Sequence, residues 1–538
     1  MKHIFAIALF ASAIWAQAPD TVLVNGKILT VDAQFSTHQA LAIREGKIIA
    51  LGTTAQMRAL AAAATRVIDL GGRTVIPGLI DSHMHAIRAA LSFSTEVNWI
   101  GARSLPEALG RLTAAAREKP AGAWLIIAGG WTADQFKELR APTQAELEAA
   151  APNNPVYVQL GYAWAILNAA GYRTLNIRAE SDLASGGKYE LDKQGKLTGA
   201  VTGPQSAIIA LFDKLPKPTP AQQIEGTKLF FKELNRLGLT GVVDPGGNNL
   251  FPADYQAIQS VWRDRQLSVR VAYALNGQTA GKEFEELQDL TQMLPMGFGD
   301  AMLHFNGIGE RITWAINNND HPNATVKEKF QQIARWAAGR GMALTIHWPN
   351  DSSVGQLLDI FEQVNREFPI AKLRWSIAHL GDATEVDMRR MKALGVGWTV
   401  QDGSYFSGVG GMPPVNTAKR LGIAVGAGTD AHRVMSYNPF TALQWFLDGK
   451  TVSGAAVRQG AERASREDAL RLYTIGSAWF SFDDASRGSL EVGKLADLAV
   501  LSKDYMTLPV DQVGTIESVL TMVGGKVVYS SGVFERSR

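Results

Sequence analysis

The chain has 538 residues, of which 46% are hydrophobic and 19% charged, a composition typical of a globular protein with a large core. Its 53 basic and 51 acidic residues give a formal net charge of +2 without a basic block, which argues against a nucleic-acid partner. Cysteine is absent, which excludes disulfides and thiolate metal sites, so any metal must bind to imidazole and carboxylate groups.

The first eighteen residues predict a cleavable signal peptide. A basic start at Lys2 precedes an apolar run from Ile4 to Trp15, and residues 16–18 form a small-x-small cleavage site. The apolar run is shorter than the roughly 20 residues that a membrane-spanning helix needs. We therefore expect a periplasmic or secreted protein that has no membrane attachment after cleavage.

Both ends of the mature chain are rich in predicted strands. A hairpin is expected over Thr21–Thr30 with its turn at Asn25-Gly26, and a second strand pair follows over Ala40–Ala50. Near the other end, strands are expected at residues 496–501, 518–523 and 526–529. Because chain ends often lie close together, we predict that residues 19–73 and 486–538 form one composite β-sandwich domain.

The middle of the chain, residues 74–485, alternates short apolar strands with amphipathic helices. The strands are expected at 124–128, 238–243, 342–346, 374–378 and 423–427, and one helix at Val326–Arg340. Such alternation is typical of a parallel sheet, open or closed. The segment from about 134 to 220 interrupts the pattern and is predicted to be an insertion.

The strongest local signal is an apolar strand that begins at Val75 and runs into His83-Met84-His85. Residues two apart on a strand point to the same side, so both imidazoles could reach one ion. Two surface histidines in a loop are the alternative, because a short motif alone is weak.

Three further residues end predicted strands: His347, His379 and Asp430. Each alone could be an ordinary polar group at a strand end. Ligand-type residues at four strand ends are difficult to explain in that way, because the carboxyl ends of parallel strands share one face. Four histidines and an aspartate suit a catalytic zinc-type centre.

The order His-x-His, His, His and Asp resembles the amidohydrolase superfamily of metal-dependent hydrolases. Residues 74–81 and 488–498 resemble the family's flanking segments, and Gly129-Gly130-Trp131 with Gly428-Thr429-Asp430 is similar to the amidohydrolase-3 branch that contains N-substituted formamide deformylases. The resemblance implies an α/β fold with a (β/α)8 TIM-like barrel, the composite β-sandwich, and the insertion beside the barrel mouth.

The resemblance also implies a reaction. One or two divalent ions, zinc being the expected metal, would be held by His83, His85, His347, His379 and Asp430, and Asp430 would carry a proton. Metal-activated water would then cleave a carbon–nitrogen bond in an amide, formamide, carbamate or cyclic amide. A metal-dependent lyase or isomerase, or a non-catalytic binding protein, are the alternatives, since a fold does not determine its chemistry.

The chain departs from the family pattern at the metal-bridging lysine. Matching Asn306-Gly307 to the family's Asp-Gly pair puts that position at Met302, so no carboxylated lysine is expected. Glu310 could supply bridging oxygens, or it could be a surface carboxylate paired with Arg311. For His304, on the same strand, a core or pocket role is expected.

The substrate side also differs from the family. Tyr162 stands beside Ala163, where relatives commonly carry a histidine, and is expected to bind substrate. Trp131 and Trp348 each adjoin a strand end and could line an apolar pocket, although core packing is the usual role of tryptophan. A small molecule is therefore the expected substrate; the oligomeric state stays open, with a homodimer as one option.

Overall fold

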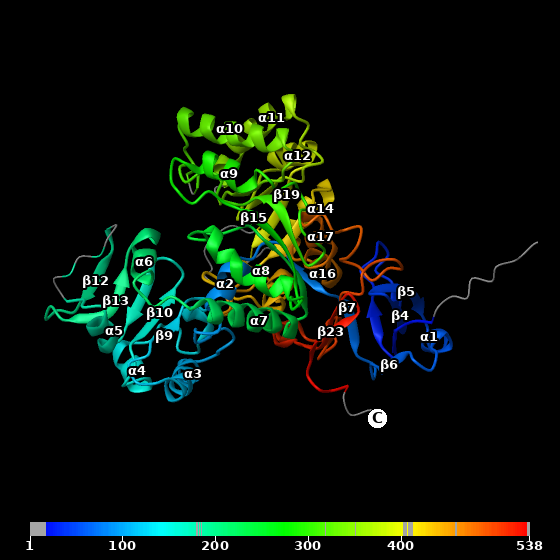
Figure 1. Cartoon of the computed structure of the whole chain (residues 1–538), viewed down its shortest axis with the longest axis horizontal. Coiled ribbons are helices and arrows are strands. Elements are labelled where there is room, and N and C mark those ends of the chain that lie inside the picture. The colour runs from blue at the N-terminus through cyan, green and yellow to red at the C-terminus, as the bar shows by residue number, and fades with distance from the viewer. Residues whose placement is uncertain are drawn as a thin grey trace, which may run out of the picture.

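The computed structural model describes residues 18–178, 181, 183, 186–317, 319–349, 351–401, 406, 413–457 and 460–534. Figure 1 shows three parts: a central body of strands and helices, a separate sheet with its own helices on one side, and strands from both chain ends on the other. The predicted signal peptide falls, except for its last residue, outside the described residues.

The strands from the chain ends form two sheets. One has the order β5-β4-β1-β6, and the other has the order β23-β22-β21-β7-β2-β3. A single hydrophobic cluster, which includes Leu23 and Leu41 of the first sheet and Val75 and Leu520 of the second, packs between them. Helix α1 (Thr54–Leu60) packs on the first sheet. The strands are β1 (Thr21–Val24), β2 (Lys27–Leu29), β3 (Thr37–His38), β4 (Ala40–Arg44), β5 (Lys47–Gly52), β6 (Arg66–Asp69), β7 (Thr74–Pro77), β21 (Leu498–Leu501), β22 (Ser518–Val523) and β23 (Lys526–Ser530).

The predicted hairpin over Thr21–Thr30 is wrong. The chain does turn at Asn25, which has a φ of 56°, but β1 pairs with β4 and β6 whereas β2 pairs with β3 and β7. The turn therefore moves the chain from one sheet to the other. The second predicted pair is present, because β4 and β5 are antiparallel around Glu45-Gly46.

Eight parallel strands occupy the centre as two four-stranded sheets, ordered β16-β15-β14-β8 and β17-β18-β19-β20. Backbone hydrogen bonds join these sheets at both edges: Ile308 N donates to Ala343 O (2.9 Å), and Ser82 N donates to Ala427 O (3.0 Å). The eight strands therefore close into a ring. They are β8 (Leu79–Asp81), β14 (Leu239–Asp244), β15 (Arg270–Leu275), β16 (Leu303–Ile308), β17 (Thr345–His347), β18 (Ser376–Ala378), β19 (Gly397–Gln401) and β20 (Val425–Gly428).

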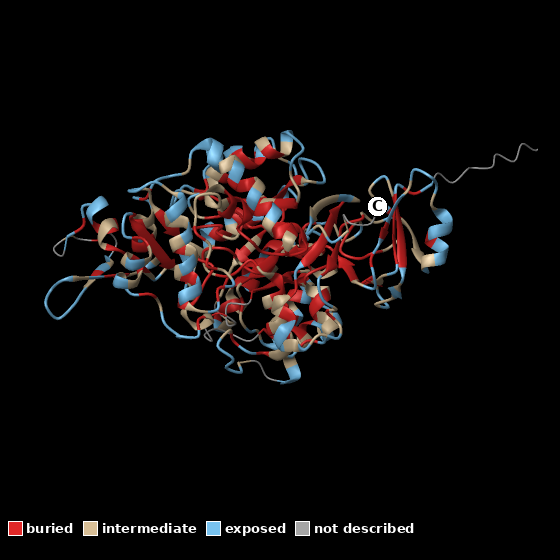
Figure 2. Cartoon of the chain, turned by 90° about the horizontal axis from the view of Figure 1, so that it is seen from below, coloured by how far each residue is buried: buried red, intermediate tan, exposed pale blue. Residues whose placement is uncertain are grey.

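Helices surround these strands, and Figure 2 shows buried strands inside helices whose outer faces are exposed. Helix α10 (Ala324–Gly339) lies close to the predicted range; Asn323 caps its first turn by accepting a hydrogen bond from Val326 N. The other helices are α2 (Ala86–Ser92), α7 (Pro220–Arg236), α8 (Gln256–Arg263), α9 (Glu283–Thr291), α11 (Val354–Glu367), α12 (Glu385–Leu394), α14 (Val415–Leu421), α15 (Pro439–Asp448), α16 (Arg466–Leu472) and α17 (Ile475–Phe480).

The separate sheet begins earlier than the insertion predicted at about 134. Its order is β12-β13-β11-β10-β9, and β9, which the sequence placed among the strands of the alternating middle, pairs with β10 instead. A short apolar strand does not reveal its partner, which explains the difference. The elements are α3 (Leu105–Glu118), β9 (Leu125–Ile127), α4 (Gln144–Ala150), β10 (Val156–Leu160), β11 (Trp164–Leu167), α5 (Ala169–Thr174), β12 (Lys188–Leu191), β13 (Leu197–Thr202) and α6 (Gln205–Phe212).

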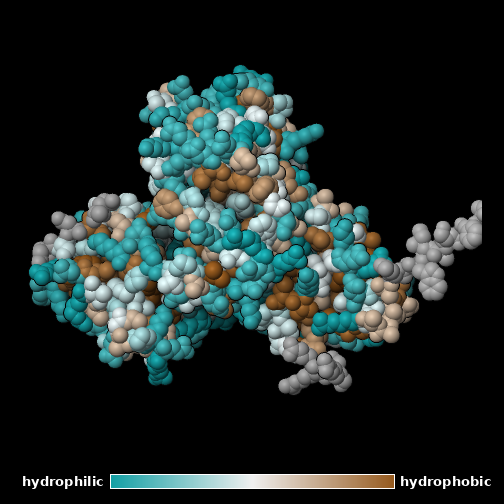
Figure 3. Space-filling view, in the orientation of Figure 1, coloured by the Kyte–Doolittle hydropathy of each residue, from teal (hydrophilic) through white to brown (hydrophobic). Residues whose placement is uncertain are grey.

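The face of the molecule in Figure 3 is largely hydrophilic, with apolar patches interrupted by polar side chains. Within the described part of the chain, none of the helices combines the length and the apolar character that crossing a bilayer requires.

A buried ion pair ties the central strands to the terminal sheets. Arg270 of β15 donates from Nε and Nη2 to the Asp497 carboxylate at 2.7 and 3.0 Å, and both side chains are almost fully buried. We expect Asp497→Ala to lower the free energy of unfolding by about 3–5 kcal/mol, because it leaves a buried guanidinium without its partner. Chemical denaturation would measure this loss. The control is Glu367→Ala, which breaks the exposed pair with Arg335 and should cost less than about 1 kcal/mol. Equal effects of the two variants would contradict the prediction.

Candidate metal centre

The five predicted ligand residues lie together at the carboxyl ends of the central strands. His83 and His85 follow β8, His347 is the last residue of β17, His379 follows β18, and Asp430 follows β20. Their ligand atoms and those of Glu310 form three overlapping groups of three residues each. Within each group, the ligand atoms all lie within 4.8 Å of one another. Parallel strands end on one face, which explains how residues so distant in sequence converge.

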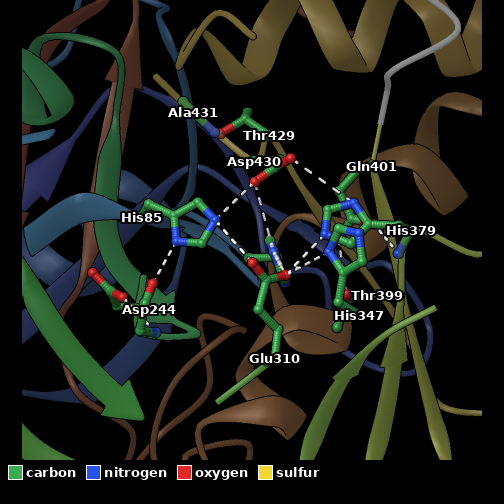
Figure 4. Close-up of polar contacts among 12 residues, drawn as sticks. His85, Asp244, Glu310, His347, His379, Thr399, Gln401, Thr429, Asp430 and Ala431 are labelled. Atoms are coloured by element: carbon green, nitrogen blue, oxygen red, sulfur yellow. Dashed lines mark hydrogen bonds and ion pairs between the residues drawn. The ribbon is translucent and has the colours of Figure 1, made fainter. Parts of the chain in front are cut away.

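Glu310 lies at the middle of this group (Figure 4). Its Oε2 is 3.2 Å from His83 Nε2, 3.2 Å from His347 Nδ1 and 3.0 Å from His379 Nε2. Its Oε1 is 3.3 Å from His85 Nε2. Of the two roles that the sequence left open, a surface carboxylate paired with Arg311 is therefore excluded.

A close approach of two backbone segments brings Glu310 to this position. Gly309 N donates to Leu275 O (2.9 Å) and Glu310 N donates to Pro245 O (3.1 Å). A Cβ atom on residue 309 would lie 1.8 Å from Pro245 O, so only glycine fits there. Met302 lies at the opposite end of β16, where its Sδ accepts a hydrogen bond from Arg270. Met302 therefore does not reach the centre, whereas Glu310, two residues beyond the end of β16, does.

Asp430 faces the same space from the other side. Its Oδ1 lies 3.1 Å from His85 Nε2 and 3.7 Å from His83 Nε2, and its Oδ2 lies 3.8 Å from His379 Nδ1. Asp430 N donates to His83 O (2.8 Å), and Gly428 packs so closely on His83 that a Cβ there would lie 2.5 Å from His83 N. The carboxylate is thus held in place by the backbone of β20.

Neighbouring groups fix the orientation of His85. Its Nδ1 donates to Gly246 O, which leaves Nε2 directed at Glu310 and Asp430. Asp244, at the end of β14, accepts hydrogen bonds from Gly246 N (2.8 Å) and Ile87 N (2.7 Å). Such outer partners set the tautomer of a ligand histidine.

Two other strand-end residues support the site, although no role was predicted for them. Asp81 accepts from His83 N (2.9 Å) and from Thr429 Oγ1 (2.7 Å), and burial raises its pKa to about 7. Gln401 Oε1 accepts from His379 N (2.7 Å). Asp81, Asp244 and Gln401 all end central strands, and that position is the signal that could have identified them.

The electrostatics of the group favour a cation at its centre. Burial opposes ionisation of Glu310, yet the His347 and His85 imidazoles hold its pKa well below the usual range. Burial, assisted by His347, lowers the pKa of His379 to about 4, so one of its ring nitrogens has a free lone pair at neutral pH. Burial and the charge of Arg88 act to lower the pKa of His85. The carboxylates of Glu310 and Asp430 outweigh them and raise this pKa to about 10. A divalent ion would take the place of that proton.

The geometry also suits a metal ion. Ligands about 2.0–2.1 Å from a tetrahedral zinc lie about 3.3 Å from one another, and the nitrogen–oxygen distances here run from 3.0 to 3.8 Å. Neither ring nitrogen of the fully buried His83 has a hydrogen-bond partner among the described residues. The donors are imidazole and carboxylate alone, the set that zinc and similar first-row ions accept. The residues present therefore fit a divalent metal.

The predicted substrate-binding residues are placed differently from one another. Trp131 is fully buried against Trp99 and Phe136, and its Nε1 donates to Gln159 O; Trp348 is 1% exposed in the central core. These two tryptophans pack in the interior, which is the alternative role expected for them. They do not form an accessible pocket wall. Tyr162 is partly exposed and is an electrostatic neighbour of Arg311. His304 is nearly buried near the start of β16, in the pocket role expected of it.

The chain is similar to known proteins in both sequence and structure. A family model described as "Amidohydrolase family" matches residues 66–529. The chain is 26% identical over 553 residues to the N-substituted formamide deformylase of Arthrobacter pascens, a match that covers 95% of this chain and 99% of that protein.

Two solved structures show the same fold. One is an uncharacterized metal-dependent hydrolase from Pyrococcus horikoshii OT3, with a TM-score of 0.63, 22% identity, and coverage of 91% of this chain and 99% of that one. The other is the atrazine chlorohydrolase TrzN from Arthrobacter aurescens TC1 complexed with zinc, with a TM-score of 0.54, 17% identity, and coverage of 96% and 97%.

Proposed function

This chain belongs to the amidohydrolase family, and from that premise we propose that it hydrolyses an amide-type bond, in a formamide, amide, carbamate or cyclic amide, with Asp430 as the proton carrier. Its general class, a metal-dependent hydrolase acting on carbon–nitrogen bonds, follows from the family match and the deformylase relative. The observation that carries the proposal is the convergence of four imidazoles and two carboxylates on one small space.

We assign two ions to the centre, zinc being the first candidate. Two of the ligand groups share Glu310: one contains His83 and His85, and the other contains His347 and His379. The two Glu310 oxygens face different histidines: Oε1 lies next to His85, whereas Oε2 lies next to His347 and His379 and also contacts His83. A carboxylate in this position can bridge two cations, in place of the lysine that the family resemblance implies.

When bound, such ions supply a Lewis acid that polarises the carbonyl and makes water nucleophilic at neutral pH. The residues of the chain orient the reacting groups and move a proton. Asp430 is ionised at neutral pH, because His379 and His85 outweigh its burial and lower its pKa to about 2. One of its oxygens can accept the proton that water loses as the oxygen–carbon bond forms. The same proton then passes to the leaving nitrogen as the carbon–nitrogen bond breaks.

We also interpret the closed ring of eight parallel strands as the family's (β/α)8 barrel, with the separate sheet as an insertion and the terminal sheets as the composite β-sandwich. The homologous fold and the carboxyl-end location of the site support this interpretation. From the pattern of residues 1–18 we further propose export to the periplasm or the exterior.

Metal removal tests the proposal. We expect the purified protein to contain about two divalent ions per chain and to release amine from N-formylbenzylamine or a related amide. Dialysis against dipicolinate should abolish amine release, and added zinc should restore it. His347→Ala should lose metal, whereas the control His321→Ala, which alters an exposed histidine away from the centre, should not. A metal-free preparation with full amine release would overturn the proposal, and a protein that binds metal but cleaves none of these bonds would contradict the hydrolytic role.

A further inference from the structure

Arg311, directly after Glu310, is a buried arginine whose acidic neighbours Glu310 and Glu283 do not contact it directly. Its side chain is 3% exposed, and its Nη1 has no hydrogen-bond partner. Among the described residues, no carboxylate forms an ion pair with it. Its guanidinium carbon instead lies 3.7 Å from the centroid of the Trp314 ring, which is partly exposed. Burial of an unpaired charge is costly, so the arrangement requires an explanation.

The other buried arginines all have a direct carboxylate partner. The described part of the chain buries three more: Arg270, Arg433 and Arg487. Each has a carboxylate oxygen within 3.1 Å, from Asp497, Glu96 and Asp483 respectively. The chain thus pairs its structural buried arginines and leaves unpaired the one beside the metal centre.

A second arginine lies close to the metal centre, near His85. Arg88 lies one turn after His85 on α2 and has no ion pair with any described residue. A Cβ atom built on Gly247 would be 3.5 Å from Arg88 Nη1 and 3.6 Å from His85 Nδ1, so the end of the Arg88 side chain and the His85 ring both border Gly247. Arg88 is also an electrostatic neighbour of Arg311.

The carboxylates nearby are already engaged. Glu310 and Asp430 face the imidazoles, and Asp244 accepts backbone hydrogen bonds from Gly246 and Ile87. Glu283, an electrostatic neighbour of Arg311, accepts from Trp314 N at 2.8 Å. Each of these carboxylates has other partners, and among the described residues none forms a direct ion pair with Arg311 or Arg88. The position of a direct carboxylate partner is therefore left for a bound molecule.

We propose that Arg311, assisted by Arg88, binds a carboxylate of the substrate, so that the substrate is an N-acyl or N-formyl compound with a free carboxylate near the bond to be cleaved. This inference rests on the proposed function and deepens it. A guanidinium is planar and binds a carboxylate through two parallel hydrogen bonds, and the Trp314 ring holds that plane in one orientation. Because Arg88 is an electrostatic neighbour both of Arg311 and of His85, the carboxylate and the reacting carbonyl fit within one small molecule.

A matched pair of substrates tests the inference: N-formylphenylalanine and its methyl ester, with metal-loaded protein. We expect kcat/KM for the acid to exceed that for the ester at least about tenfold. Arg311→Met should lower kcat/KM for the acid about 100-fold, mainly through KM, while the value for the ester changes less than about threefold. Arg311→Lys keeps the charge but not the planar guanidinium. Its kcat/KM for the acid should lie between those of the original protein and of Arg311→Met. The control Arg389→Met, at an exposed helix position, should change neither value.

Binding measurements distinguish the carboxylate site from the hydrolytic function. In metal-loaded Asp430→Asn protein, where turnover is blocked, calorimetry should show tighter binding of the acid than of the ester, and Arg311→Met should remove the difference. If the ester is hydrolysed as well as the acid, and Arg311→Met affects both equally, the carboxylate site is refuted while the hydrolase stands. If neither compound is hydrolysed but Arg311 still governs binding of the acid, the carboxylate site is supported and the hydrolytic role is what fails.

Discussion

Asp430→Asn is expected to lower the rate of amine release by about 10²- to 10⁴-fold, the range that a positioned proton carrier contributes. The amide has the shape of the carboxylate but does not accept a proton from water at neutral pH. The fold should persist, because residue 430 has a φ of 54°, a left-handed conformation that asparagine tolerates well. Its backbone bond to His83 O would also remain. Steady-state kinetics and circular dichroism would measure the two effects.

The control for this variant is Asp69→Asn, which makes the same chemical change at an exposed position in the terminal sheets. It should leave turnover unchanged. Metal analysis of Asp430→Asn is needed beside the kinetics, because Asp430 also faces His83 and His85. Turnover at the original rate with a full metal content would contradict the role of Asp430.

Alternation of strands and helices, together with turn residues, predicted most strands of the fold but not every partner. The turn at Asn25-Gly26 lies where the sequence puts it, yet β1 and β2 enter different sheets. Likewise, β9 is a strand as predicted, but it pairs within the separate sheet. Local patterns encode a turn or an apolar strand, whereas pairing depends on residues that are remote in sequence.

Five residues of the candidate site could be located from the sequence because they share one rule: each closes or directly follows a strand. His347 is the last residue of β17, and Asp430 lies just beyond β20. Trp131 and Trp348 adjoin strands in the same way but are buried, since a tryptophan beside a strand is as suitable for the core as for a pocket.

Local sequence does not determine the surroundings of Arg311. The sequence suggested that it could pair with its neighbour Glu310, but adjacent residues in an extended segment point in opposite directions. The structure directs Glu310 toward the imidazoles and Arg311 onto Trp314. Only the three-dimensional arrangement shows that the guanidinium is buried and lacks a carboxylate.

Glu310→Gln should have the largest effect on metal binding. The substitution keeps the side-chain volume but replaces a carboxylate oxygen with an NH2 group, which cannot act as a ligand and would point a donor at the imidazoles. Because Oε1 and Oε2 face different histidines, the variant should retain at most about one ion per chain, with affinity reduced at least about 100-fold. Mass spectrometry of metal content and amine-release kinetics would measure both losses.

Glu310→Asp distinguishes the bridging role from a purely structural one. The shorter carboxylate keeps the charge but cannot span the same two sides, so it should recover one ion without recovering full turnover. The control Glu385→Gln, on the exposed surface of α12, should bind metal and turn over normally. If Glu310→Gln holds about two ions with unchanged affinity, then Glu310 is not a bridge and the two histidine pairs must bind metal independently. If instead both Glu310 variants fold but bind no ion at all, the carboxylate is required by the whole centre, and a single shared ion would replace the bridged pair.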